Sequence, residues 1–345
     1  MSLFSEAIVA IDGSKFKAVN NRDRNFTHAK MQRRMAQIEE NIARYLTDMD
    51  TADRAEPEIA AVKTSRLRDK IAALKQQMQQ LKEIETRMLA APDQQISLTD
   101  SDARSMNARG SGIVGYNVQT AVEAKTHLIV AHEVTNVGND RGHLATMANQ
   151  ALAAMGTEEL TVIADRGYFS GDEILACDQA GMTPFVPKPL NSNSKADGRF
   201  GKPDFIYVAS DDEYRCPAGQ RLIKRFTTVE AGMTLNIYWS SACPRCPIKA
   251  QCTTGSERRV RRWVHEAVID AMQERLDRDP EKMRVRRQTV EHPFGTIKYW
   301  MGATHFLMKT LERVRTEMSL HVLAYNLKRV MQLLGIGGLI AAMRA

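Results

Sequence analysis

The feature of this 345-residue chain that most constrains its fold is a helical pattern over residues 27–92. Apolar side chains recur there at alternating spacings of three and four residues, first over 31–49 and again over 67–88. This spacing is typical of helices that pack against each other along a seam. Pro57 lies between the two runs and blocks one continuous helix, because proline lacks an amide hydrogen. We therefore predict two helices that form an antiparallel coiled-coil hairpin.

Two roles for this hairpin are open on the sequence alone. One is an arm for dimerisation or for contact with DNA, and the other is a structural spacer. The polar faces of both helices carry charges of both signs, which indicates only that they meet water. A coiled-coil scaffold as the function of the whole chain accounts for this stretch alone and leaves the acidic and cysteine patterns unexplained.

The segments on both sides of the hairpin alternate between strand and helix patterns. The runs "EAIVAID", "IVGYNVQTAV", "LIVAHEV", "LTVIAD" and "TPFVPKP" are predicted strands. Helical patterns over 140–156 and 171–181 lie between the later strands, and Gly156 closes the first of them. The order predicts an α/β fold, a mixed sheet with helices packed on it. A final helix over 311–334 is expected to face the core with Leu320, Leu323, Leu327 and Met331.

The composition is that of an ordinary soluble globular protein, with 43% apolar residues and a mean hydropathy of −0.37. No run of eighteen apolar residues exists, so no transmembrane helix is expected. The first residues lack the basic segment and long apolar stretch of a secretory signal peptide. We therefore expect a cytoplasmic, nucleoid-associated protein without membrane contact.

The net charge of +7 comes from the C-terminal part of the chain. Residues 1–257 hold 31 lysines and arginines against 32 acids, whereas residues 258–345 hold 17 against 9. Such a basic block suits a polyanion, because lysine and arginine displace the counterions condensed on phosphates. The charge favours a nucleic-acid partner, and a solubilising surface is the alternative.

Four of the five cysteines fall in one segment, residues 206–262, with the spacing C-x26-C-x2-C-x5-C. They are Cys216, Cys243, Cys246 and Cys252. Four thiolates are typical of a closed, tetrahedral, structural Zn²⁺ site, which would stabilise a segment too small to build its own core. Unpaired thiols are the main alternative, and disulfides are disfavoured because nothing indicates secretion. The fifth cysteine, Cys177, is expected to be a small buried apolar side chain.

Three acids form a candidate metal site. Asp12 ends "EAIVAID" and Asp165 ends "LTVIAD", so both are expected at the carboxyl ends of strands, where open α/β sheets place their sites. Glu291 lies on a helix within the basic stretch "RRQTVEHPFGTIKYWMG", and Pro293 predicts a local break in that helix. A strand-end aspartate taken singly is often only a turn former. Together, the three carboxylates suit two Mg²⁺ (or Mn²⁺) ions that promote in-line attack on a phosphodiester.

These segments resemble the DDE transposases of bacterial insertion sequences, in the branch with a cysteine-containing insert. The resemblance is carried by "VAIDGSKFKAVNNRDRNFT", "DSDARSM" followed by "GYNVQTAVEA", "VIADRGYFSGDEI", the cysteine insert and "RRQTVEHPFGTIKYWMG", which together span nearly the whole chain. It implies a ribonuclease H-like sheet and an acidic DDE triad. Carried over to this sequence, the triad is Asp12, Asp165 and Glu291.

The family also has a signature of Tyr, two residues, Arg, three residues, Glu, six residues and Lys. Arg287, Glu291 and Lys298 match its last three places. Arg284 stands in the place of the tyrosine, and Arg284 and Arg286 are candidates to replace its contact with phosphate. We expect these four cations to bind the DNA backbone.

Three further residues have competing interpretations. Asp102, in "DSDAR", is the rival for the first acid, but it precedes a strand instead of ending one. Asp140 and Arg141 are candidates to contact DNA or metal-bound water, although capping the following helix is the simpler role for them.

The resemblance implies a transposase catalytic region that hydrolyses a phosphodiester at the element ends and joins the freed 3′-hydroxyl to target DNA. Its partners would be double-stranded DNA (terminal inverted repeats and target) and a second copy in a synaptic homodimer. Family members usually carry an N-terminal helical domain ahead of the first acid. Because Asp12 is close to the start, the sequence looks like a catalytic portion with impaired recognition of element ends. A truncated, non-catalytic DNA-binding remnant is the alternative.

The expected organisation has five segments. Residues 1–26 begin the catalytic core, 27–92 form a helical-hairpin insertion, 93–205 continue the core, 206–262 form a zinc-ribbon-like insertion, and 263–345 complete the core with helices.

Overall fold

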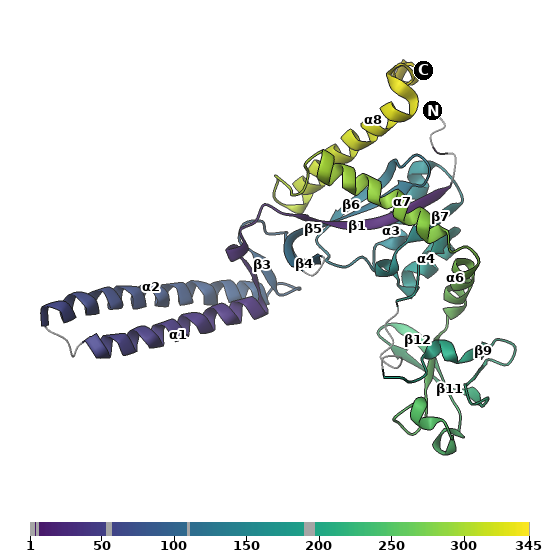
Figure 1. Cartoon of the computed structure of the whole chain (residues 1–345), viewed down its shortest axis with the longest axis horizontal. Helices are drawn as coiled ribbons and strands as arrows, with labels where there is room; N and C mark the ends of the chain where they lie inside the picture. Colours follow the sequence, from purple (N-terminus) through teal and green to yellow (C-terminus); the bar gives the residue numbers. More distant parts are fainter. Residues whose placement is uncertain (1–3, 5–6, 53–56, 109–110, 190–196, 345) are drawn as a thin grey trace.

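The structure, a computed structural model, describes residues 4, 7–52, 57–108, 111–189 and 197–344. At its centre is a mixed sheet with the strand order β4-β5-β1-β7-β8, in which β6 also pairs with β5 (Figure 1). The central strand β1 is antiparallel to β5 and parallel to β7. The strands are β1 (Ile8–Lys17), β4 (Arg104–Ala108), β5 (Ser111–Glu123), β6 (Ile129–Thr135), β7 (Leu160–Ala164) and β8 (Met182–Phe185). This confirms the predicted α/β class and is compatible with a ribonuclease H-like fold.

Helices cover both faces of this sheet. Successive side chains of β1 point to opposite sides, so this one strand contacts helices on both faces. Val9 and Ile11 pack with α3 (Leu144–Met155), α4 (Gly171–Gln179) and α6 (Glu266–Arg278). Phe16 packs on the other face, with α7 (Lys282–Gly295) and α8 (Leu311–Arg344). The sheet is therefore the middle of three layers, and α7 crosses β1 in the same view (Figure 1).

A helical hairpin extends away from the sheet (Figure 1). It consists of α1 (His28–Ala52) and α2 (Pro57–Leu89), and its base is held by the short paired strands β2 (Asn25–Thr27) and β3 (Gln95–Ser97). The turn between the helices, residues 53–56, lies outside the described residues. The heptad positions form the seam, where Met31, Ile38, Met78 and Leu81 are buried between the two helices. The apolar side chains of the repeat are thus largely used within the hairpin.

A second, five-stranded antiparallel sheet carries the cysteine segment and connects to the core through α6 (Figure 1). Its order is β13-β12-β11-β10-β9. The strands are β9 (Ile206–Val208), β10 (Glu213–Arg215), β11 (Arg221–Glu230), β12 (Met233–Trp239) and β13 (Val260–Trp263). A small aromatic cluster, which includes Phe205, Tyr214 and Tyr238, is buried beneath it.

The face of the last helix that was predicted to pack in the core is exposed to solvent. Helix α8 packs on the sheet through Val314, Met318, Val322 and Tyr325. The four residues expected in the core are exposed, with 59% for Leu320, 63% for Leu323, 49% for Leu327 and 39% for Met331. The prediction was wrong because α8 carries two apolar stripes at helical spacing, and spacing alone does not say which stripe meets the sheet.

The predicted break beside Glu291 was also wrong. Helix α7 runs through Pro293 to Gly295 and is followed by a single π-helical turn over Thr296–Trp300. Val290, Pro293 and Phe294 are buried, so packing on the sheet compensates for the hydrogen bond that proline cannot make. Within the described residues, none of the helices combines the length and apolar character of a bilayer span.

Candidate active site

Asp12 and Asp165 lie side by side on neighbouring strands. In the parallel pair β1–β7, Ile11 is opposite Ala164, the last residue of β7, so the two aspartates follow that pair directly. Asp165 is therefore at the carboxyl end of its strand, as predicted. Asp12 is not at the end of its strand, because β1 continues to Lys17 in its pairing with β5. The apolar run ends at Asp12, but the backbone pairing does not.

Arg286 of α7 lies between the two acids. Its Nη2 is 2.7 Å from Oδ1 of Asp12 and 3.4 Å from Oδ2 of Asp165. The Arg286 side chain is only 14% exposed, and its Nε has no hydrogen-bond partner in the described parts of the chain. The residue predicted to contact DNA thus contacts the candidate metal ligands instead. Its guanidinium shows that this position favours a cation.

The surroundings of Asp12 disfavour the ionised form of its carboxyl group. Its pKa is raised from 3.8 to about 6, first by burial. Arg286 opposes the rise, whereas the negative charges of Asp165 and Asp140 add to it. One guanidinium therefore does not fully compensate the clustered carboxylates. A divalent cation would lower the free energy of the ionised form further.

Asp140 belongs to this acidic cluster, although capping the following helix was the simpler role that the sequence offered for it. Its Oδ1 accepts hydrogen bonds from Asn117 Nδ2 at 2.7 Å, Gln119 Nε2 at 2.8 Å and Lys15 Nζ at 3.2 Å. Asp140 does not cap the following helix, because His143 is at the N-cap position of α3. The available signal was "NVQT" in a predicted strand, where two amides on one face of a buried strand require polar partners.

Two glycines make room for this cluster. A Cβ on Gly13 would lie 2.5 Å from Nε2 of Gln119 and 2.7 Å from Oδ1 of Asp140. A Cβ on Gly167 would lie 2.9 Å from Oδ1 of Asp165, the oxygen that accepts a 2.7 Å hydrogen bond from the Gly167 amide. Asp12 and Asp165 are thus each followed closely by a glycine, and polar side chains fill the space that a Cβ would need there.

Glu291 is not brought to the other acids in this structure. It is exposed on α7, five residues after Arg286, which places it about 140° further round the helix. Across the residues that the structure describes, no group of three or more His, Cys, Asp or Glu side chains is arranged to hold a metal ion. The observed cluster therefore consists of Asp12, Asp165, Asp140 and Arg286.

A match to a protein family decides the class of protein. The family model of the transposase DDE domain matches residues 86–327. The chain belongs to this family. The match includes Asp140, Asp165 and Glu291, while Asp12 precedes it and joins the site through strand pairing. No curated protein and no solved structure matches the chain.

The other predicted cations of this transposase domain have different surroundings. Lys298 Nζ donates to Oγ of Ser14 at 2.7 Å and to the carbonyl oxygen of Lys15 at 2.8 Å, so it is tied to β1 close to the acids. Arg287 is exposed on α7. Arg284 is also exposed and lies 3.6 Å from Glu281. Arg284 and Arg287 thus lie on the outer side of the transposase domain, whereas Lys298 is partly buried.

Asp102, the rival first acid, has a local structural role. Its Oδ2 accepts a 2.8 Å hydrogen bond from the amide of Leu311, the first residue of α8. Asp100 accepts a 3.0 Å hydrogen bond from the amide of Thr310. Together they bind amides at the N-terminus of α8, where carboxylates are stabilised by the helix dipole.

The four clustered cysteines of the transposase domain line one cavity of about 30 Å³. They form no disulfide. Burial raises the pKa of the Cys252 thiol, Arg258 lowers it, and the charges of the other three thiols raise it further. The four thiols are therefore close enough to influence one another, although they are not arranged as metal ligands among the described residues. Cys177 is fully buried on α4, as expected.

Proposed function

We propose that this chain is the catalytic region of a DNA transposase that cleaves phosphodiesters at element ends and joins the 3′-hydroxyl to target DNA. One observation carries the proposal. Asp12 in strand β1 and Asp165 at the end of the neighbouring strand β7 lie with a cation, the guanidinium of Arg286, between them. The family match supports transposase activity in general, and these residues suggest where its chemistry takes place.

The donor set fits a divalent metal ion. Asp12 and Asp165 supply carboxylate oxygens, which Mg²⁺ and Mn²⁺ prefer. The guanidinium of Arg286 provides, between these oxygens, the positive charge that a metal ion would provide. We propose these two aspartates as ligands of two Mg²⁺ (or Mn²⁺) ions and Glu291 as the third ligand, which would have to approach them from its exposed position on α7. When bound, such ions activate the attacking oxygen and stabilise the leaving oxygen.

The chain's own residues would position the substrate. Arg286 holds the two carboxylates together before metal binds, and its guanidinium is suited to hold a phosphate once it leaves them. Arg284, Arg287 and Lys298 are proposed to bind the DNA backbone next to the scissile phosphate. Asp140, fixed by its three donors, keeps the polar floor of the site rigid.

We propose the same division of the chain into segments as the sequence predicts. The core comprises residues 1–26, 93–205 and 263–345, interrupted by the hairpin of 27–92 and the cysteine segment of 206–262. The active assembly is a homodimer bound to the terminal repeats and target as double-stranded DNA.

Zn²⁺ bound by Cys216, Cys243, Cys246 and Cys252 is a further part of the proposal. The shared cavity and the mutual influence of the thiols support it, because four thiolates would close around one ion in a segment with a small core. Elemental analysis should find one zinc per chain, lost in Cys243→Ser and retained in Cys177→Ser. Zinc-free protein that is folded would contradict it.

A non-catalytic DNA-binding remnant is the alternative function. The position of Glu291 favours it, because this acid is exposed and separate from the other two. The two functions differ in whether the wild-type chain cuts DNA when metal is supplied.

The test is nicking of supercoiled plasmid DNA with Mg²⁺ or Mn²⁺. Wild type should nick the plasmid, and Asp165→Asn should reduce the rate by at least about 100-fold, since removing an essential metal ligand removes several kcal/mol of transition-state stabilisation. Asp178→Asn, an exposed acid on α4, is the matched control and should keep the activity. Nicking that survives Asp165→Asn refutes the site, and DNA binding without nicking by wild type identifies the remnant.

A further inference from the structure

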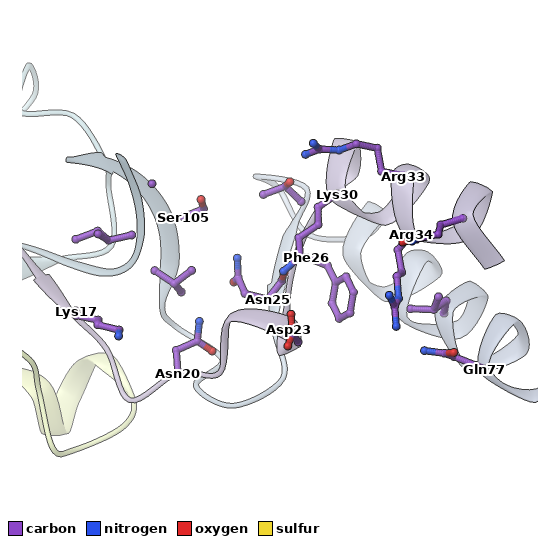
Figure 2. Close-up of a pocket in the computed structure, with 16 residues that line it drawn as sticks. Lys17, Asn20, Asp23, Asn25, Phe26, Lys30, Arg33, Arg34, Gln77 and Ser105 are labelled. Atoms are coloured by element: carbon purple, nitrogen blue, oxygen red, sulfur yellow. The ribbon is translucent and has the colours of Figure 1, made fainter. Parts of the chain in front are cut away.

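A large groove lies away from the acids, between the base of the hairpin and the edge of the central sheet. It has a volume of about 1100 Å³. Figure 2 shows Lys17, at the end of β1, on the side of the sheet, and Lys30, Arg33 and Arg34 of α1 on the other side. The central sheet and the helical hairpin therefore both contribute to this surface.

The groove is strongly basic. Among the described residues that line it, four are cations and Asp23 is the single acid. Lys17, Arg33 and Arg34 form no ion pair with any residue that the structure describes. Arg33 Nε donates only to a carbonyl of its own helix, that of Ala29 at 3.2 Å. An ordinary solubilising surface mixes both signs, so this excess of positive charge fits an anionic ligand.

The spacing of the cations fits an extended polyanion. Lys30, Arg33, Arg34 and Gln37 are at positions i, i+3, i+4 and i+7 of α1, and all four line the groove. This row spans about 10 Å along the helix, or about three nucleotide steps at 3.4 Å each. Lys17 provides positive charge from the opposite wall. A single phosphate would fill only a small part of this groove.

The lining does not provide a surface for stacking bases. Its aromatic residue, Phe26, is 7% exposed, and it packs with the hairpin seam. Lys30 Nζ lies 5.6 Å from the centre of that ring and donates to the carbonyl of Asn25 at 2.8 Å. The groove therefore offers cations and amides for phosphates, without an aromatic platform for bases.

The groove and the candidate active site share strand β1. Lys17 is five residues after Asp12 on β1, which corresponds to about 16 Å along the strand. The odd separation places the two side chains on opposite faces of β1, so a duplex with its scissile phosphate at Asp12 meets the exposed Lys17 by passing the end of the strand. A contact at this distance adds affinity without entering the chemistry.

We propose that this groove is a DNA-binding site that holds the backbone of the duplex flanking the scissile phosphate, independently of sequence. The inference rests on the proposed function, which supplies the DNA substrate, and it assigns the hairpin a role. The hairpin is a DNA-positioning arm whose basal turn of α1 clamps DNA against the sheet. A dimerisation arm fits less well, because the apolar heptad side chains are buried between α1 and α2.

The test compares two double variants with the same change in net charge. Arg33→Gln with Arg34→Gln removes two groove cations, whereas Arg66→Gln with Arg68→Gln removes two exposed cations of α2 outside the groove. Fluorescence anisotropy measures the Kd of a labelled duplex of about 30 base pairs over a range of salt concentrations. Thermal melting confirms that each variant is folded.

The groove variant should bind about 10-fold more weakly, and its slope of log K against log salt should be smaller by about 2. The loss should be equal for duplexes of unrelated sequence, and Arg33→Lys with Arg34→Lys should restore most of the binding. The control pair should change the slope by less than about 0.5.

Three results would overturn the inference. Equal binding by the groove variant and the control pair means that the groove holds no DNA, while plasmid nicking by both keeps the proposed function intact. A loss confined to one sequence means that the groove reads bases. Wild type that neither binds nor nicks DNA refutes both the groove and the proposed function.

Discussion

The guanidinium of Arg286 lies 2.7 Å from the carboxylate of Asp12 and 3.4 Å from that of Asp165. A cation of the chain thus bridges the two acids that we propose as metal ligands. The bridge keeps two carboxylates together that would otherwise repel each other. It also means that metal and Arg286 compete for the same oxygens.

Asp12→Asn should stabilise the metal-free protein at neutral pH. The folded-state pKa of Asp12 is raised from 3.8 to about 6, so the native state holds this proton more tightly than the unfolded chain. The contribution of Asp12 to stability is complete below pH 3.8 and is lost as the pH rises through 6, a loss of about 2–3 kcal/mol. The amide mimics the protonated acid and avoids that loss. Chemical denaturation should show the variant more stable at pH 7.5, with the difference vanishing near pH 4. A variant less stable than wild type at pH 7.5 contradicts the raised pKa.

Arg286→Ala should tighten Mg²⁺ binding in the absence of DNA. Removing the guanidinium leaves both carboxylates without their competing cation, and we expect affinity to rise by about 10-fold. Isothermal titration calorimetry with MgCl₂ measures this directly. Arg287→Ala, the exposed neighbour on α7, is the control and should leave the affinity unchanged. Weaker metal binding in Arg286→Ala would falsify the competition.

Gly115→Ala should disrupt the central sheet. A Cβ at Gly115 on β5 would lie 2.0 Å from the carbonyl oxygen of Phe16 on β1, and two paired backbones cannot move apart without loss of their hydrogen bonds. We expect a loss of about 3 kcal/mol or more. Gly112, on the same strand, has open space within 4 Å of the added Cβ, so Gly112→Ala should change stability by about 0.5 kcal/mol or less. Urea unfolding distinguishes the two variants, and equal stability of both would show that β1 and β5 are further apart.

The parts of the fold that the sequence could predict depend on local patterns. Apolar runs and their ending at Asp165 locate a strand and its carboxyl end, because these signals lie within a few residues. A local pattern could not predict which face of α8 packs on the sheet, because the helix has two apolar stripes, one with Val314 and the other with Leu320. Only the position of the sheet decides between them.

The parts of the site that the sequence left open depend on contacts between distant residues. The sequence could not decide between a capping role and a site role for Asp140, because only folding places Asn117 and Gln119 of strand β5 against it. The basic groove was hidden for a related reason. Residues 1–257 are nearly neutral in total, and folding gathers Lys17 and Arg34 on one surface.

The most direct measurement of the central claim is anomalous X-ray scattering from crystals soaked in Mn²⁺. If Asp12 and Asp165 are metal ligands, an anomalous peak should appear within about 2.5 Å of oxygens from both carboxylates, with the Arg286 side chain moved away from them. The same soak of Asp165→Asn crystals should show a much weaker peak. A wild-type crystal without manganese between these aspartates, or with Arg286 still bridging them at saturating Mn²⁺, would contradict the proposed active site.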